Sequence, residues 1–214
     1  MTAAQWGAPL ITSADSVINA HNNLSTLEKK RHLRAAMRRA RRSLSNREHL
    51  HAGHRLKQQL NQNPYFKYAK HIAIYLPNDG EVSTQAAIQQ AWDHKQTVYL
   101  PVLHPLKDGH LWFVEYTPYS AMKKNRFGIM EPDPKLNRRI QPRFIQTIGL
   151  PLVAFDKQGN RLGMGGGFYD RTFEFCRIKK GIKPKLFGLA HRCQAVEILP
   201  TESWDIQLSS IIIC

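Results

Sequence analysis

The stretch QTIGLPLVAFDKQGNRLGMGGGFYDR, residues 146–171, decides how this chain is interpreted. Its first part, 146–155, is a largely apolar run, which is typical of a strand that is buried on both faces of a sheet. A turn is expected at 156–159, and glycines then cluster within 163–167. The pattern at 168–177 predicts a helix. A strand that leads through a glycine cluster into a helix is one way in which α/β proteins bind phosphate.

The spacing of the glycines excludes two common phosphate-binding motifs. The order is G-x-G-G-G rather than GxGxxG, and no G-K-[ST] sequence closes it as in a P-loop. A tight turn is the alternative interpretation of the cluster. Asp170 follows the glycines directly, so its carboxylate either complements the first turn of the predicted helix or binds Mg²⁺ beside phosphate oxygens.

Outward from this stretch, short β-branched and aromatic runs alternate with segments of helical spacing. The predicted strands are 71–76, 97–103, 111–116, 185–191 and 209–214, and the predicted helices are 27–44, 45–60 and 83–94. Ser45 followed by Glu48 indicates a capping box. We expect an α/β fold, a three-layer α/β/α sandwich with a mostly parallel sheet, formed by residues 26–214 as a single domain. Residues 1–25 are expected to be a poorly ordered N-terminal extension.

The charge of the chain is strongly positive. Its 214 residues include 31 Lys+Arg and 16 Asp+Glu, a net charge of +15, and eight of the basic residues lie within 28–42. This charge predicts an anionic partner, which the residues alone leave open between nucleic acid, a phospholipid surface and a polyanionic small molecule. Three cysteines exclude a disulfide framework, and no apolar run is long enough for a membrane helix. This use of cysteine fits a reducing compartment, and residues 1–25 have no signal-peptide or transit-peptide character, so we expect a cytoplasmic protein.

Four separated segments resemble one known family. GNRLGMGGGFYDR, preceded by LPLVAFD, resembles the signature of the 5-formyltetrahydrofolate cyclo-ligases, also called methenyltetrahydrofolate synthetases. KRHLR (30–34), IYLPNDGEVST (74–84) and NRFGIMEP (125–132) resemble further segments of that family in the same order. The resemblance covers about residues 27–206. Since four separated segments agree, the motif set is highly specific.

The resemblance implies a fold of the type shared with ribose-phosphate isomerases and CoA-transferases. It also implies an ATP- and Mg²⁺-dependent ligase that closes 5-formyltetrahydrofolate to 5,10-methenyltetrahydrofolate and releases ADP and phosphate. The expected ligands are therefore ATP as co-substrate, Mg²⁺ as cofactor and a folate that is polyglutamylated. We expect a monomer with no membrane partner and no specific nucleic-acid partner.

The resemblance also implies site residues. The implied ATP-binding residues are Lys30, Arg34, Arg161, Leu162, Gly163, Met164, Gly165, Gly166, Gly167, Phe168 and Tyr169. The implied substrate-binding residues are Leu76, Glu81, Met164, Gly165, Gly166, Gly167 and Phe168. Arg161 and Tyr169 are the implied catalytic residues, and Asp170 and Asp205 the implied Mg²⁺ ligands. The chain departs from the family at Phe168, where tyrosine is commoner, and at Ser209, where the family often has a second acid.

Two alternatives to the cyclo-ligase remain. A basic nucleic-acid-binding protein would account for the charge, but the basic segment 28–42 contains no Phe, Tyr or Trp on which bases could stack. A divergent ATP-dependent paralogue would keep the glycine loop and act on another substrate. ATP and polyglutamylated folate are both polyanions, so the cyclo-ligase hypothesis also accounts for the charge.

Overall fold

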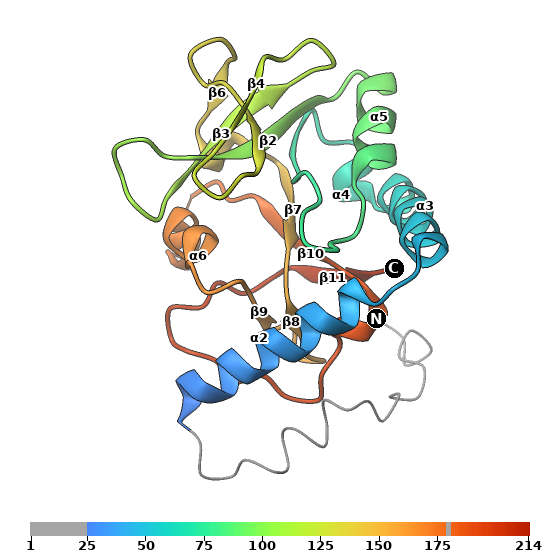
Figure 1. Ribbon diagram of the computed structural model, residues 1–214. Coiled ribbons are helices and arrows are strands. Elements are labelled where there is room, and N and C mark those ends of the chain that lie inside the picture. Colours follow the sequence, from blue (N-terminus) through green and yellow to red (C-terminus); the bar gives the residue numbers. More distant parts are fainter. Residues whose placement is uncertain (1–24, 179–180) are drawn as a thin grey trace.

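The computed structural model describes residues 25–178 and 181–214 (Figure 1). Apart from Ser25, the predicted extension over residues 1–25 lies outside the described residues. Within the described ranges, no helix combines the length and the apolar character that crossing a membrane requires.

The two long helices near the start of the described chain both begin with a capping box. The Ser25 hydroxyl accepts a hydrogen bond from Glu28 N–H, while the Glu28 carboxylate accepts from Ser25 N–H. Ser45 and Glu48 repeat this arrangement, as predicted. Each box gives partners to N–H groups that the first helical turn leaves unpaired. The helices are α2 (Thr26–Arg42), α3 (Asn46–Gln62), α4 (Pro64–Lys67) and α5 (Gln85–Asp93).

A seven-stranded sheet forms the centre of the molecule. Its strands are β1 (His71–Ala73), β2 (Thr97–Leu103), β3 (Leu111–Tyr116), β6 (Arg139–Ile140), β7 (Thr147–Pro151), β10 (Lys185–Ala190) and β11 (Ser210–Ile213). Their order is β11-β10-β7-β1-β2-β3-β6. The pairs from β11 to β2 are parallel, and β3 and β6 add an antiparallel edge. The predicted α/β fold with a mostly parallel sheet is therefore confirmed.

Two short hairpins beside this sheet were not predicted. The first pairs β4 (Met122–Lys124) with β5 (Met130–Pro132), and the second pairs β8 (Ala154–Phe155) with β9 (Arg161–Leu162). These strands have two or three residues each, so they are too short to show an alternating pattern in the sequence.

The prediction of one strand over 146–155 was wrong. β7 ends at Pro151, and β8 begins at Ala154 in the separate hairpin. The interruption has a physical cause, because the Leu152 carbonyl accepts hydrogen bonds from the side chains of Arg41 and Gln194 instead of a neighbouring strand. The strand predicted at 71–76 is likewise shorter, since β1 ends at Ala73.

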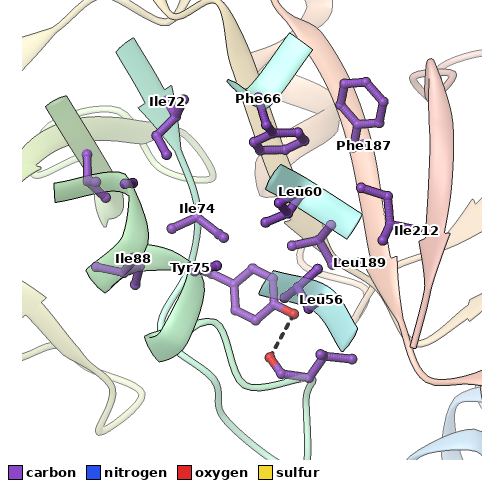
Figure 2. Packing of buried hydrophobic residues seen from close by; sticks show 14 of the residues in the cluster. Leu56, Leu60, Phe66, Ile72, Ile74, Tyr75, Ile88, Phe187, Leu189 and Ile212 are labelled. Carbon is purple, nitrogen blue, oxygen red and sulfur yellow. Dashed lines mark hydrogen bonds between the residues drawn. The ribbon is translucent and has the colours of Figure 1, made fainter. Parts of the chain in front are cut away.

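Helices α3, α4 and α5 cover one face of the sheet (Figure 1). Figure 2 shows how Leu56 and Leu60 of α3 and Phe66 of α4 pack among side chains from the strands. The strand side chains include Ile72, Phe187, Leu189 and Ile212, and Ile74, which follows β1 directly, packs beside them. This apolar contact fixes the sheet against its helices, and most of the favourable energy of folding comes from burial of this kind.

The other face is covered by a shorter segment that follows the glycines. It consists of α6 (Phe168–Thr172) and a 3₁₀ turn at Glu174–Arg177. Phe173, between them, is fully buried against Phe113 of β3. Helix α2 packs separately, with Leu33 and Met37 against the β8–β9 hairpin. Helical elements therefore lie on both faces of the sheet.

The cluster around α3 allows a direct test of this packing. Leu56 has no exposed surface, whereas Leu50 on the same helix is 64% exposed. We expect Leu56→Ala to lower the free energy of unfolding by about 2–5 kcal/mol, because it removes buried methyl groups and leaves a cavity. The matched variant Leu50→Ala should change it by less than about 0.5 kcal/mol. Urea denaturation measures both, and equal effects would contradict the packing described.

Candidate active site

A cavity of about 850 Å³ opens beside the carboxyl ends of the parallel strands. Its wall includes Leu76, which follows β1, Leu103 at the end of β2, and Leu152, which follows β7. Ligands of open α/β sheets usually bind at this edge. The structure brings every residue that the sequence analysis assigned to ATP, substrate or metal to the wall of this one cavity.

The glycine loop, residues 163–167, forms part of that wall between the β8–β9 hairpin and α6. Gly165 has φ +100° and Gly167 has φ +63°, backbone conformations in which other residues are strained. A side chain at position 167 would also lie 2.9 Å from Arg171 Nη1. The glycines therefore let the backbone of the loop reach the cavity without obstruction.

The helix after the glycines is shorter than predicted. The prediction of one helix over 168–177 was wrong, since α6 has five residues and ends at Thr172. So few aligned peptide groups give a small helix dipole. The positive charge at this end of the cavity comes instead from side chains, above all from α2.

Helix α2 directs two cations at the cavity. Arg34 Nε donates a hydrogen bond to the Gly163 carbonyl at 2.9 Å, so its guanidinium lies against the glycine loop. Lys30 Nζ lies 3.5 Å from Glu202 Oε1 and 3.9 Å from Asp205 Oδ2. The two residues stand one helical turn apart, which places them on the same face of α2, as the sequence spacing predicted.

Arg161 and Asp170 form an ion pair in the wall of the cavity. Arg161 Nη2 donates to Asp170 Oδ1 at 2.7 Å, and Arg161 Nη1 donates to the Ile206 carbonyl. Asp170 Oδ1 also accepts from Ile206 N–H at 3.1 Å. This ring of contacts ties the β8–β9 hairpin and α6 to the C-terminal loop that carries Asp205.

The carboxylates of Asp170 and Asp205 each have one oxygen in use. Asp205 Oδ2 accepts from Glu202 N–H at 2.8 Å, as Asp170 Oδ1 does from its two partners. Within residues 25–178 and 181–214, Asp170 Oδ2 and Asp205 Oδ1 make no hydrogen bond, and no group of three or more His, Cys, Asp or Glu residues is arranged to hold a metal. Two carboxylates with free oxygens fit Mg²⁺, which takes one or two carboxylates and completes its shell with phosphate and water.

Glu81, whose side chain is 12% exposed, also lies in the wall of the cavity. Burial raises its pKa to about 7, although Asn78 N–H, which donates to Glu81 Oε2 at 3.0 Å, and the charge of Arg41 act in the other direction. Burial also raises the pKa of Tyr169, with a further contribution from the charge of Glu81. The carboxylate therefore lies in a poorly hydrated part of the wall, where a bound N–H donor would be strongly preferred.

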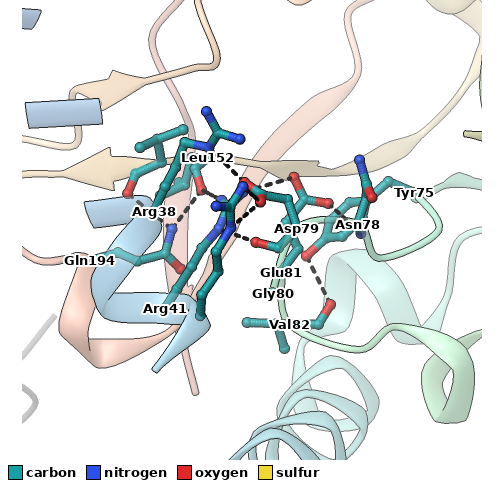
Figure 3. A network of polar contacts seen from close by, with 12 residues as sticks. Arg38, Arg41, Tyr75, Asn78, Asp79, Gly80, Glu81, Val82, Leu152 and Gln194 are labelled. Atoms are coloured by element: carbon teal, nitrogen blue, oxygen red, sulfur yellow. Dashed lines mark hydrogen bonds and ion pairs between the residues drawn. The ribbon is translucent and has the colours of Figure 1, made fainter. Parts of the chain in front are cut away.

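Three arginines of the basic run converge on Asp79 (Figure 3). Arg38 Nε and Arg41 Nη2 each donate to Asp79 Oδ2 at 2.7 Å, and Arg42 donates to Oδ1. Burial of Asp79 favours its neutral form, but these hydrogen bonds outweigh burial and lower its pKa to about 2. Part of the basic run is thus engaged inside the protein and contributes less to the outer surface than its sequence suggested.

The sequence analysis missed one wall of the cavity. The β4–β5 hairpin contributes Asn125, Phe127 and Glu131 to the lining, and Phe127 meets Phe168 edge to face at 6.0 Å. The segment NRFGIMEP carried the signal, because it matched the family pattern, but the resemblance gave its residues no role. Arg41 and Asp79 were missed as well, since charged residues in a basic helix and in a loop are usually solvated.

Comparison with known proteins identifies the class of this protein as a ligase. Residues 26–214 match the model of the 5-formyltetrahydrofolate cyclo-ligase family. This chain belongs to the 5-formyltetrahydrofolate cyclo-ligase family, as the resemblance predicted.

Individual relatives agree with the family model. The chain is 49% identical to a 5-formyltetrahydrofolate cyclo-ligase of Haemophilus influenzae over 69% of its own length and 77% of the relative. It is 40% identical to a 5-formyltetrahydrofolate cyclo-ligase of Escherichia coli over 82% of its own length and 95% of the relative. Among solved structures, the 5,10-methenyltetrahydrofolate synthetase of Aquifex aeolicus superposes with a TM-score of 0.72 at 30% identity, covering 86% of this chain and 89% of that one. The 5,10-methenyltetrahydrofolate synthetase of Mycoplasma pneumoniae superposes with a TM-score of 0.66 at 25% identity, covering 86% of this chain and 97% of that one.

The three ion pairs of Asp79 predict an acid-sensitive contribution to stability. The folded-state pKa is about 2 against an ordinary value of 3.8, so the contribution is complete above about pH 5 and disappears as the pH falls through 2. We expect Asp79→Asn to lower the free energy of unfolding by roughly 2 kcal/mol at pH 7 and by much less at pH 2. Denaturant titrations across this pH range test the expectation, and a loss that is the same at every pH would contradict it.

Proposed function

We propose that the protein catalyses the ATP- and Mg²⁺-dependent cyclisation of 5-formyltetrahydrofolate to 5,10-methenyltetrahydrofolate, with release of ADP and phosphate. One observation carries this proposal: the four segments that resemble the cyclo-ligases meet around a single cavity, whose wall contains the cations of α2, the glycine loop and Glu81. The cavity volume of about 850 Å³ lies in the range of roughly 300–1,000 Å³ that small-molecule sites typically have.

The reaction needs an activated carbonyl. The formamide carbon is a poor electrophile and its oxygen a poor leaving group, so the γ-phosphoryl group of ATP is transferred to the formyl oxygen and ADP leaves. Nitrogen 10 of the folate attacks the activated carbon and gives up its proton, and phosphate departs with the oxygen. Catalysis of this kind comes mainly from positioning and from stabilisation of charge.

Different residues of the cavity bind ATP, bind the folate and act on the reacting groups. Lys30 and Arg34 bind the phosphates together with the backbone N–H groups of the glycine loop. Glu81 and Leu76 hold the folate, with the Glu81 carboxylate accepting from N–H groups of the ligand. Arg161 and Tyr169 act where the two ligands meet, and Phe168 contacts both without the hydroxyl of the commoner tyrosine.

Asp170 and Asp205 hold Mg²⁺ through the oxygens that are free of protein contacts. The ion, when bound, neutralises charge on the phosphates and fixes their orientation. Arg161 keeps the Asp170 carboxylate in place, and Lys30 Nζ lies 3.9 Å from Asp205 Oδ2. We further propose that residues 26–214 work as a single domain and a monomer, and that the folate is polyglutamylated.

A turnover assay tests the proposal. We expect the purified protein to form 5,10-methenyltetrahydrofolate, followed by its absorbance, when 5-formyltetrahydrofolate, ATP and Mg²⁺ are all present. Product that forms equally fast without ATP would exclude a ligase. Absence of turnover together with salt-dependent binding to nucleic acid of mixed sequence would favour the alternative of a basic nucleic-acid-binding protein.

The two cations of α2 give a second prediction. Charged hydrogen bonds contribute roughly 1.5–3 kcal/mol each, so Lys30→Ala and Arg34→Ala should each lower kcat/KM for ATP by about 10- to 100-fold. Arg42→Ala is the matched control, since Arg42 lies on the same helix, is 54% exposed and contacts Asp79. Steady-state kinetics at varied ATP distinguish the variants. Small and equal effects for all three would show that the basic helix acts as diffuse charge.

The carboxylate pair gives a third prediction. Asp170→Asn keeps the shape of the side chain and removes its charge, so activity should require a higher Mg²⁺ concentration. A modest loss of thermal stability should accompany it, because the ion pair with Arg161 is weakened. Asp108→Asn is the matched control, since the Asp108 side chain is 85% exposed, pairs with Arg126 and does not line the cavity. An unchanged Mg²⁺ dependence in Asp170→Asn would assign Asp170 to structure alone.

A further inference from the structure

Arg41 is a fully buried cation that joins three segments beside the cavity (Figure 3). Its Nε donates to the Asp79 carbonyl and its Nη2 to Asp79 Oδ2, both at 2.7 Å. Its Nη1 donates to the Leu152 carbonyl at 3.3 Å. Arg41 thereby connects α2, which carries the proposed ATP-binding cations, with the 77–82 loop and with the chain that leads into the glycine loop.

The charge of Arg41 extends beyond its contact with Asp79. Arg38 and Arg42 share the same Asp79 carboxylate, but their side chains are 37% and 54% exposed, so water screens them. Arg41 has no exposed surface, and a buried cation needs compensating negative charge close by. Glu81 meets this need in part, with its Oε1 at 4.0 Å from Arg41 Nη2.

We propose that Arg41 is a positioning residue that holds the 77–82 loop against α2 and favours the charged form of the Glu81 carboxylate at the cavity wall. The inference rests on the proposed function, in which Glu81 binds the folate. The Arg41 side chain has no exposed surface of its own at the cavity. It acts through the place and the charge of Glu81.

The groups around Glu81 have opposing effects on its ionisation. Burial and, to a smaller extent, the charge of Asp79 raise its pKa, whereas Asn78 N–H and Arg41 lower it, and the net result is a pKa of about 7. Tyr75 and Tyr169 face it as neutral phenols, because burial raises the pKa of both.

His191, behind the loop, contributes no charge. Its Nε2 lies 3.2 Å from the Gly80 carbonyl, and burial lowers its pKa to about 4, with a further effect of neighbouring His49. The imidazole is therefore neutral near pH 7. Within the described ranges, Arg41 is thus the cation that favours the charged form of Glu81.

Two substitutions separate this role from general support of the fold. Arg41→Gln removes the positive neighbour of Glu81, so the pKa of Glu81 should rise. Asp79→Asn removes the negative neighbour, so the pKa of Glu81 should fall. Both variants release the 77–82 loop, and both should raise KM for 5-formyltetrahydrofolate about 10-fold or more while KM for ATP changes less.

The measurement is a titration of the Glu81 carboxyl carbon by NMR in the full chain, without substrate, together with pH profiles of kcat/KM for the folate. We expect the titration midpoint to move up by about one pH unit in Arg41→Gln and to move down in Asp79→Asn. Arg42→Gln, which removes another Asp79 contact on the exposed side, should leave the midpoint close to that of the wild type.

Midpoints that stay in place, or that move in the same direction in both variants, would overturn the inference. If Arg41→Gln does not fold, Arg41→Lys is the second variant, because it keeps the charge and removes the paired contacts with Asp79. KM for the folate should still rise in Arg41→Lys. An unchanged KM would overturn the inference. Wild-type protein without turnover would refute the proposed function, and the NMR titration would still decide whether Arg41 sets the charge of Glu81.

Discussion

A buried guanidinium requires hydrogen-bond acceptors on every side, and this requirement shapes the region around Arg41. Its acceptors come from the 77–82 loop and from Leu152. Because Leu152 turns its carbonyl toward Arg41 and Gln194, β7 ends there and the chain leaves the sheet for the β8–β9 hairpin. The hairpin then presents the glycine loop to α2, so the position of one cation is linked to the geometry of the whole cavity.

The distribution of charge inside the cavity follows from these contacts. Cations of α2 stand at the end with the glycine loop, and carboxylates without full hydrogen bonding stand beside them. The Asp79 carboxylate forms ion pairs with Arg38, Arg41 and Arg42 of the same helix. The cavity wall as a whole contains six basic and six acidic side chains, so the net charge of +15 is not concentrated there and the positive charge that meets a phosphate is a local one.

Much of the fold could be predicted from the sequence, because long amphipathic helices and apolar parallel strands leave clear periodic patterns. The capping box at Ser45 and Glu48 marked the start of α3 to the residue. The break at Leu152 could not be predicted, since it depends on side chains of Arg41 and Gln194 that are distant in sequence. The length of α6 was overestimated for a different reason. Apolar residues continue past Thr172, but the chain there forms a 3₁₀ turn instead of a longer helix.

For the site, motif resemblance identified residues that the structure gathers around one cavity, but it carried no information on how they are held. The roles of Arg41 and Asp79 depend on burial, which local sequence does not reveal. A crystal structure of the protein with MgADP and 5-formyltetrahydrofolate bound together would test the proposed site directly. The account predicts phosphates against Arg34 and residues 163–167, and the folate against Glu81 in the same cavity. Either ligand bound outside this cavity would contradict it.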